Sequence, residues 1–153
     1  MKLKFILYLL IALPFLGSCN NEDDVEEIFA SGTWYVVNYY GKANWDKRNG
    51  EPKYKATDKE GRAALEVISK FTLVFKTDGS LEGSMQNGSF KGTWQADGKD
   101  RTIRLDIEGN PNTSSYNGEY INALRNAAFY QGDSNFIMLG PEDKKTYIQF
   151  KHN

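Results

Sequence analysis

Two residues that often act as nucleophile and base, Cys19 and His152, each occur as the only one of their type in this chain. Nucleophilic catalysis needs such groups within hydrogen-bond reach, oriented by a third group. His152 stands next to the last residue, where we expect a frayed end without a catalytic role. No Gly-x-Ser-x-Gly, His-Glu-x-x-His or P-loop pattern occurs. The sequence therefore predicts no catalytic residue, no metal site and no cofactor.

Carboxylates could still act in pairs, as they do in glycoside hydrolysis. Glu82, Asp106 and Glu108 lie on or beside expected strands. Side chains alternate along a strand, so Glu82 lies opposite Leu81 and Asp106 opposite Ile107, which indicates the solvent side. We expect a protein that is not an enzyme, with a small carboxylate-based hydrolase as the alternative.

Aromatic side chains gather early in the chain, in a segment that is otherwise polar. We take Tyr35, Tyr39, Trp45 and Tyr54 as candidate contacts for a ligand or a partner. Exposed Trp and Tyr offer a large flat surface with a polar handle. The alternative is that this segment folds over one end of the domain and its rings seal that end.

The first 18 residues have the pattern of a secretory signal. Lys2 and Lys4 precede an apolar run over 5–16, which ends in Leu-Gly-Ser before Cys19. The run is shorter than the roughly 20 residues that span a bilayer as a helix. The ending resembles the lipobox of bacterial lipoproteins. That resemblance implies cleavage before Cys19 and lipid attachment to its sulfur, which would anchor the protein in a membrane; the alternative is an ordinary thiol.

An acidic block follows over residues 20–27, and we expect residues 19–30 to form the lipidated Cys and a flexible tether. The block resembles the acidic export signals of surface lipoproteins in Bacteroides-type bacteria. Asn20 stands where an inner-membrane lipoprotein carries Asp. These resemblances imply an outer-membrane location, with the cell surface favoured over the periplasmic face.

The composition of the remaining chain favours one β-rich domain over residues 31–153. Aromatic residues make up 14% and charged residues 25% of the whole chain, and its formal net charge is −1. No basic cluster indicates a nucleic-acid partner. Glycine is frequent, and the periodicity typical of helices is mostly missing.

The clearest strand pattern lies over residues 71–107. Apolar residues alternate in four segments, separated at Asp78-Gly79, Asn87-Gly88 and Asp97-Gly98. At the first two turns we expect type I′ geometry, with positive φ at both central residues. The segment predicts a four-strand antiparallel meander.

Other elements are expected on either side of this meander. Residues 31–41 read as a first strand, and residues 42–56 as irregular because Pro52 discourages pairing. A capping box at Thr57 and Glu60 predicts a helix to about Ser69.

After a polar loop over residues 108–115, Asn117 could cap a helix over 119–128. Short strands follow at residues 129–130, 136–139 and 145–150. The total of roughly seven to nine strands predicts a mainly β, small antiparallel β-barrel with one or two short helices. We place Trp34, Phe75, Trp94, Leu105 and Phe150 in its core.

Two families share parts of this pattern. Gly32-Thr33-Trp34, the strand and turn at 71–80, and Gly92-Thr93-Trp94 resemble bacterial lipocalin-like lipoproteins. Residues 119–124 and the strands that follow resemble the META domain of small envelope lipoproteins. META domains usually carry a Gly-Cys-Asn stretch, whereas this chain has Gly83-Ser84-Met85. Both resemblances imply a barrel-like, non-enzymatic envelope protein.

We therefore expect a lipid-anchored protein that binds a small apolar ligand inside the barrel or a partner protein at one barrel end. The alternative is a structural or stress-related envelope protein whose barrel is filled and holds no ligand. A barrel of about eight strands has room for either filling side chains or one small ligand.

Overall fold

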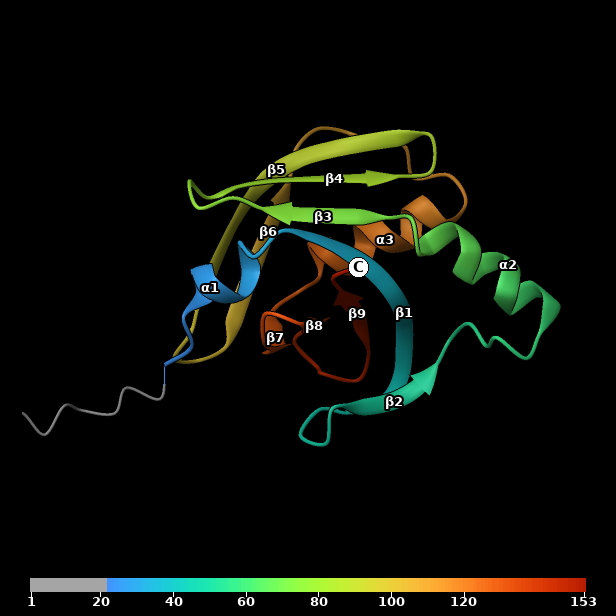
Figure 1. Cartoon of the computed structure of the whole chain (residues 1–153), viewed down its shortest axis with the longest axis horizontal. Coiled ribbons are helices and arrows are strands. Elements are labelled where there is room, and N and C mark those ends of the chain that lie inside the picture. The colour runs from blue at the N-terminus through green and yellow to red at the C-terminus, as the bar shows by residue number, and fades with distance from the viewer. Residues whose placement is uncertain (1–21) are drawn as a thin grey trace, which may run out of the picture.

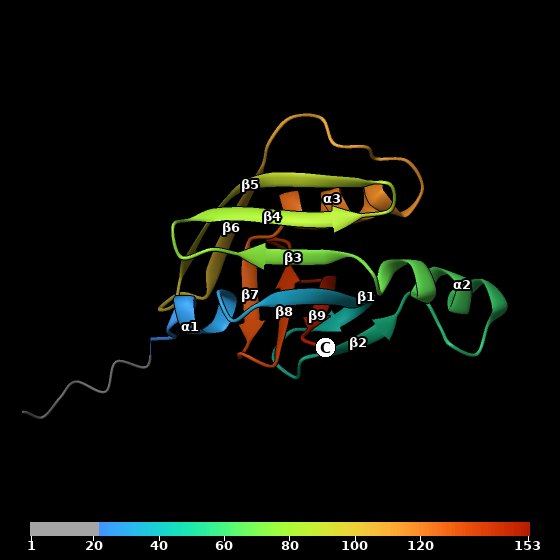
Figure 2. The ribbon, with the colours of Figure 1, turned by 45° about the horizontal axis from the view of Figure 1, so that its top comes forward.

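The computed structural model describes residues 22–153, so Cys19 and the expected leader lie outside the described residues. Nine strands form one antiparallel sheet in the order β2-β1-β3-β4-β5-β6-β7-β8-β9. A further pairing of β1 with β9 brings all strands except β2 into a ring (Figures 1 and 2). The predicted mainly β, barrel-like fold is confirmed. The strands are β1 (Thr33–Asn44), β2 (Asn49–Pro52), β3 (Thr72–Phe75), β4 (Ser80–Met85), β5 (Gly88–Asp97), β6 (Thr102–Ile107), β7 (Phe129–Gly132), β8 (Phe136–Gly140) and β9 (Tyr147–Lys151), and the described helices are α1 (Val25–Phe29), α2 (Lys59–Ile68) and α3 (Tyr116–Arg125).

The pairing between β6 and β7 is the shortest in the ring. These strands share the register pair Thr102 and Phe129. The Ile103 amide donates to the Ala128 carbonyl and the Tyr130 amide to the Arg101 carbonyl, both at 3.0 Å. Beyond this point β6 leaves β7, and α3 packs against both β6 and β8. A helix thus covers the strand edge that the sheet leaves open.

The meander over β3–β6 forms as predicted, with buried and less buried residues alternating along β3 and β4. Its first two turns are not the expected type I′, which needs positive φ at both central residues. Only Gly79, with φ of 85°, has positive φ in the first turn. Only Asn87, with φ of 55°, has it in the second. The hairpins form, but with other turn geometry.

Aromatic side chains fill the barrel, and the five residues predicted for the core are buried: Trp34, Phe75, Trp94, Leu105 and Phe150. Two helices close the ends. Phe29 of α1 packs at ring-centroid distances of 4.9 Å from Phe75 and 4.9 Å from Tyr130.

Tyr120 of α3 enters the barrel near the opposite end of β3. Its ring lies 5.2 Å from that of Phe71, and its hydroxyl donates to the Thr72 carbonyl at 2.8 Å. Phe29 and Tyr120 have 0% of their surface exposed. The interior therefore holds side chains from the chain itself.

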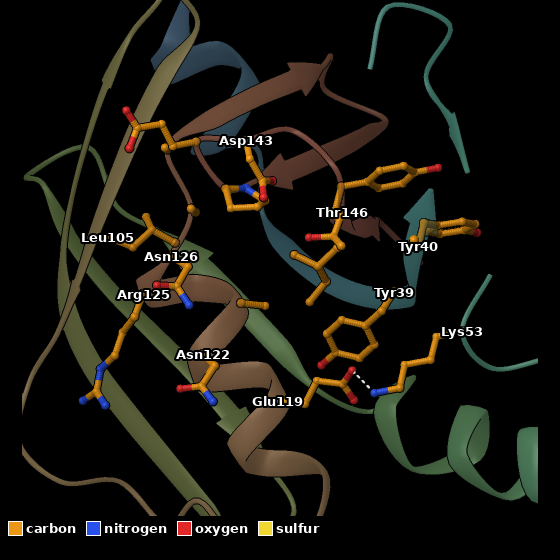
Figure 3. A pocket seen from close by; sticks show the side chains of 18 of the residues that line it. Tyr39, Tyr40, Lys53, Leu105, Glu119, Asn122, Arg125, Asn126, Asp143 and Thr146 are labelled. Atoms are coloured by element: carbon orange, nitrogen blue, oxygen red, sulfur yellow. Dashed lines mark hydrogen bonds and ion pairs between the residues drawn. The ribbon is translucent and has the colours of Figure 1, made fainter. Parts of the chain in front are cut away.

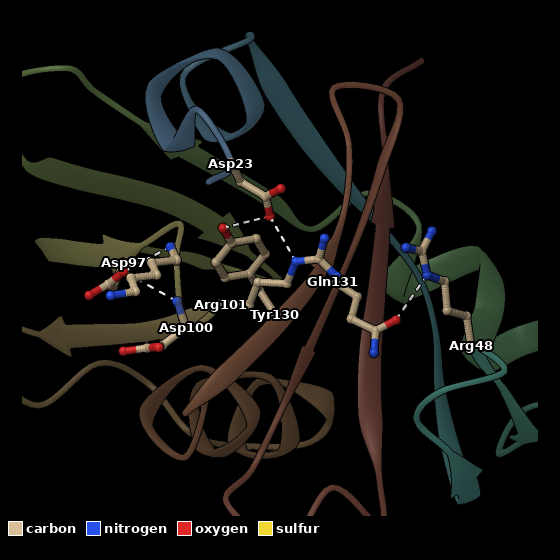
Figure 4. Close-up of polar contacts among 8 residues, drawn as sticks. Asp23, Arg48, Asp97, Asp100, Arg101, Tyr130 and Gln131 are labelled. Carbon is tan, nitrogen blue, oxygen red and sulfur yellow. Dashed lines mark hydrogen bonds and ion pairs between the residues drawn. The ribbon is translucent and has the colours of Figure 1, made fainter. Parts of the chain in front are cut away.

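The acidic segment that we expected to be a flexible tether is folded from Asp23 onward. Asp23 accepts from the Tyr130 hydroxyl at 3.0 Å and pairs with Arg101 at 3.1 Å (Figure 4). Asp24 caps α1 by accepting from the Glu27 amide at 3.1 Å. Because α1 contributes buried Phe29, residues 23–30 belong to the barrel.

The opposite terminus is also held, and the expected fraying of His152 is wrong. Its ring stacks on Trp34 with centroids 3.9 Å apart. Its Nδ1 lies 2.8 Å from the Thr33 carbonyl and its Nε2 lies 2.9 Å from Ser31 Oγ. These contacts give His152 a structural role beside β1.

The helix starts differ from the predicted caps. The N-cap of α2 is Asp58, and Thr57 donates to its carboxylate at 3.3 Å instead of capping the helix. The N-cap of α3 is Ser115. Asn117 is buried within α3, where its amide donates to the Gln86 carbonyl at 2.8 Å and accepts from the Gln86 amide at 3.1 Å. This pair fastens α3 to the β4–β5 turn.

Residues 42–56, expected to be irregular, contain a hairpin. Strand β1 continues to Asn44 and pairs with β2 through Tyr40 with Pro52 and Gly41 with Glu51. Pro52 is tolerated because it ends a strand at the edge of the sheet. This hairpin forms one wall of the groove described next.

Candidate functional site

An open groove of about 1480 Å³ lies beside α3 (Figure 3). The β1–β2 hairpin, β6, α3, the β8–β9 loop and β9 line it through five segments. These are residues 39–42, 51–53, 104–106, 119–128 and 141–148. The groove is therefore built from strands and a helix that are far apart in the sequence.

A bulge at Val37, next to Asn38, shifts the pairing of β1 with β9 along the groove wall. Along β9, the partner of Val36 is Phe150 and the partner of Asn38 is Gln149, so β1 carries an extra residue between them. The buried Asn38 amide donates to the Tyr54 carbonyl at 2.7 Å. Its oxygen accepts from the amides of Tyr39 at 2.8 Å and Tyr54 at 3.3 Å. Asn38 thereby holds the chain at Tyr54 against the barrel.

Four side chains form a polar cluster at the inner end of the groove. Glu119 of α3 accepts from the Tyr54 hydroxyl at 2.7 Å and forms an ion pair with Lys53. The Tyr39 and Tyr54 rings meet edge to face at 6.2 Å. Burial raises the pKa of Tyr54 above its ordinary value, and its hydrogen bond to Glu119 raises this pKa further. Tyr54 is therefore a neutral donor at physiological pH.

The Tyr39 hydroxyl is a buried polar atom without a hydrogen-bond partner within residues 22–153. Tyr39 is 7% exposed, and its hydroxyl points toward α3 at the inner end of the groove (Figure 3). Burial, followed by the nearby charge of Glu119, raises its pKa well above the ordinary value. The hydroxyl therefore stays protonated and can donate to an acceptor. A buried group without a partner costs about 1–3 kcal/mol.

A stacked tyrosine pair forms the wall where β1 meets β9. The rings of Tyr40 and Tyr147 lie 4.6 Å apart at an interplanar angle of 13°. Burial raises the pKa of Tyr147 to about 12. Both side chains are therefore neutral near pH 7 and add a flat surface with two hydroxyls to the groove.

Charges of both signs line the outer rim of the groove. Lys42 pairs with Glu51 at 3.0 Å, and their side chains are 77% and 65% exposed. Across the groove, Arg104 pairs with Asp106 at 3.1 Å. Exposed ion pairs contribute little to stability, so an incoming charged group can replace either partner at small cost.

Two of the four predicted aromatic contacts meet at this site. Tyr39 lines the groove, and Tyr54 contacts it through Glu119. Tyr35 lies instead on β1 between Lys151 and Thr72, outside the groove lining. Its contribution to this groove is not supported.

Trp45 lies at the tip of the β1–β2 hairpin, packed against the barrel wall. A Cβ added to Gly140 would come within 2.5 Å of its ring. Its carbonyl accepts from Gln131 at 2.9 Å, and Gln131 in turn accepts from Arg48 at 2.9 Å (Figure 4). These contacts hold Trp45 against β7 and β8, outside the groove lining.

The groove also contains residues that sequence reasoning did not select, above all Glu119, Asn122, Asn126 and Tyr147. Glu119 and Asn122 lie on α3 and Asn126 is its C-cap, whereas the predicted pattern defined only the buried side of the helix. The polar residues between the buried positions were a signal for an exposed face, but only the fold shows that this face borders a groove.

The carboxylates considered for hydrolysis lie on the outside of the barrel. Glu82 pairs with Lys76 at 3.1 Å, Asp106 pairs with Arg104, and Glu108 is exposed.

Within residues 22–153, no cluster of three or more His, Cys, Asp and Glu residues is placed to hold a metal ion. In the same part of the chain, no helix combines the length and apolar character needed to cross a membrane.

Comparison with known proteins gives a family and a solved relative. Residues 20–152 match the family described as a domain of unknown function, DUF4847. A DUF4847 family protein from Bacteroides vulgatus ATCC 8482, known from a crystal structure at 1.00 Å resolution, shares 61% identity with this chain. The match has a TM-score of 0.81 and covers 84% of this chain and 97% of the relative. No curated protein matches. The META-domain and lipocalin-like resemblances are not supported by these comparisons; the chain belongs to the DUF4847 family.

Proposed function

We propose that this protein is a lipid-anchored, non-enzymatic binding protein of the bacterial cell envelope, and that it binds a partner protein in the groove beside α3. The observation that carries the groove assignment is the Tyr39 hydroxyl, which is buried and has no hydrogen-bond partner among residues 22–153. Buried polar groups are nearly always paired, so an exception at a groove wall indicates a donor available to a ligand.

The packed interior favours this external site over a ligand inside the barrel. Phe29 from α1 and Tyr120 from α3 fill space between the strands near opposite ends of β3. A small apolar ligand would have to displace such side chains, each of which stabilises the fold by several kcal/mol when buried (about 3–5 for Phe). The partner protein is therefore the version that we retain.

The size and chemistry of the groove also fit a partner. Its volume of about 1480 Å³ exceeds the roughly 300–1,000 Å³ that is usual for small-molecule pockets. Its tyrosines provide contact area, and its paired charges provide orientation. A mixed polar surface of this kind fits a protein segment better than an apolar molecule.

The membrane anchor is proposed from the leader and the single cysteine at position 19. We place the protein on the outer membrane, facing the cell exterior. Replacement of the anchor by Cys19→Ser should release the protein from membranes into soluble fractions. Protease treatment of intact cells should then remove the wild-type domain. If the domain resists protease in intact cells but is digested after the cells are lysed, the external location is contradicted.

Site-directed photo-crosslinking in isolated native envelopes tests the groove. Because the proposed lipid occupies the sole cysteine, Asn122→Cys introduces one reactive thiol for a benzophenone label. Ala63→Cys places the same label on the exposed face of α2, away from the groove, and is the matched control. We expect a discrete adduct from position 122 and none from position 63. Absence of an adduct at 122, or equal adducts at both, would contradict the proposal.

The filled barrel also supports a second candidate, a structural or stress-related envelope protein without a ligand. Its supporting observation is the packing of Phe29 and Tyr120 within the barrel. This candidate predicts no specific adduct from either crosslinking position. It also predicts that deletion of the protein lowers envelope resistance, whereas variants with an altered groove maintain it as well as the wild type does.

A further inference from the structure

The outer face of α3, together with its C-cap residue, carries a regular polar pattern that borders the groove. Asn122 and Asn126 are separated by four residues, are both exposed and both line the groove (Figure 3). Residues four apart lie on the same face of a helix, about 6 Å apart along its axis. The groove therefore contains two carboxamides in a row.

This spacing matches the repeat of an extended polypeptide. Successive residues on one side of an extended chain are about 6.6–6.8 Å apart. A carboxamide offers donors and an acceptor, as does the peptide group that it would meet. Asn122 and Asn126 can therefore each pair with one of two backbone units that lie two residues apart in a bound segment.

Small side chains on α3 and just after its end leave room for such a segment. Ala123 and Ala127 line the groove next to the two asparagines, and Ala127 is 8% exposed. A backbone can approach a helix closely where its neighbouring side chains are methyl groups. The groove is also open to solvent rather than enclosed, so a chain could enter from the side.

The two walls provide contacts beyond the backbone. The ion pairs Lys42–Glu51 and Arg104–Asp106 lie on different walls and offer both signs of charge to side chains of the segment. At the inner end, Tyr39 offers a neutral donor without a partner within the described residues. Glu119 lies near this hydroxyl (Figure 3), and its side chain is 25% exposed, so a shift of the Glu119 side chain would give a carbonyl access to the hydroxyl.

We propose that the groove binds an extended polypeptide segment that lies along α3. Asn122 and Asn126 hold its backbone at two-residue spacing, and the Tyr39 hydroxyl donates to one of its acceptor groups. This inference rests on the proposed binding function and specifies the partner surface: an unfolded stretch of a protein rather than a folded face or a small polar molecule.

Selection from a random peptide library against the full-length chain in detergent provides the ligand for the test. The variant Asn122→Ala/Asn126→Ala should bind the selected peptides about tenfold or more weakly, because two hydrogen-bonding groups are lost. Asn110→Ala/Asn135→Ala removes two exposed asparagines outside the groove and should bind like the wild type. Equal thermal unfolding midpoints would show that all three proteins are folded.

Backbone methylation of the best peptide tests the spacing itself. N-methylation should weaken binding at alternate positions, those whose amides face α3, and should have little effect at the intervening positions. Peptides that bind with no such period of two, or binding that is unchanged in Asn122→Ala/Asn126→Ala, would overturn the inference. A library that yields no binder would also overturn it.

The crosslinking result separates failure of this inference from failure of the proposed function. An adduct at position 122 without peptide binding leaves a partner protein in the groove that is recognised as a folded surface. Absence of both adduct and peptide binding removes the groove as a binding site.

Discussion

At the residue scale, two buried tyrosines near the groove differ in whether their hydroxyls have a hydrogen-bond partner. Tyr120 and Tyr39 are both buried tyrosines, but the Tyr120 hydroxyl donates to the Thr72 carbonyl and the Tyr39 hydroxyl has no partner within residues 22–153. An unpaired buried donor lowers stability, whereas a paired one supports it. The contrast identifies Tyr120 as a hydroxyl that stabilises the fold and Tyr39 as the one that, in the proposed function, donates to a ligand.

Tyr39→Phe should leave the free energy of unfolding unchanged or raise it by up to about 1 kcal/mol, because the variant no longer buries an unpaired hydroxyl. The same change should weaken ligand binding. Tyr120→Phe is the control and should lower stability by about 1–2 kcal/mol, because the Thr72 carbonyl loses its donor. Chemical denaturation measures both. A clear loss of stability in Tyr39→Phe would show that the hydroxyl has a structural partner.

Asn38→Ala should lower the free energy of unfolding by about 1–3 kcal/mol. The change leaves the half-buried Tyr54 carbonyl and the Tyr39 amide without their side-chain partner. Asn44→Ala, at an exposed position that accepts from the Lys47 amide, should cost less than Asn38→Ala. Equal losses in the two variants would show that the bulge next to Asn38 does not organise the groove wall.

At the element scale, local patterns predicted strands and helices better than they predicted how these begin and end. Alternation identified the four strands of the meander because each buries one side. At the start of α3 the expected cap differed because its side chain has a partner outside its own segment. Asn117 pairs with Gln86 in the β4–β5 turn instead of capping α3.

The start of α3 stores backbone strain at Ser115, which has φ of 53° and ψ of −132°. Such conformations favour glycine and cost other residues about 1–3 kcal/mol. Ser115→Gly should therefore raise the free energy of unfolding by about 1 kcal/mol, measured by chemical denaturation. Ser114→Gly, at a residue without positive φ, should lower it by about 0.5–1 kcal/mol. A destabilised Ser115→Gly protein would contradict strain at the helix start.

At the scale of the whole molecule, the fold class could be predicted but the groove could not. Turn residues and alternation indicated a small barrel, and the residues predicted for its core are buried. The groove joins β1, β6, α3 and β9, and no local pattern fixes which of these segments meet. The contacts that fix Asp23 and His152 were missed for the same reason, since each joins an end of the chain to a residue far away in the sequence.

The many buried tyrosines give the molecule a defined response to alkaline pH. Burial raises the pKa values of Tyr39 and Tyr120 above their ordinary value of 10.0. A group whose pKa is raised on folding contributes stability below its unfolded pKa and loses it as pH rises. The free energy of unfolding should therefore fall above about pH 10, with tyrosinate absorbance from these residues appearing only on unfolding. Ionisation of Tyr39 and Tyr120 near pH 10 with the fold intact would contradict this packing.

Hydrogen–deuterium exchange, compared between native envelopes and purified protein in detergent, tests the groove most directly. If a partner protein lies along α3, amides over 116–128 and 51–53 should exchange more slowly in the envelopes. Amides of the β3–β4 hairpin, outside the groove, should exchange at the same rate in both. Equal rates throughout, or slower exchange confined to the β3–β4 hairpin, would contradict binding at the groove.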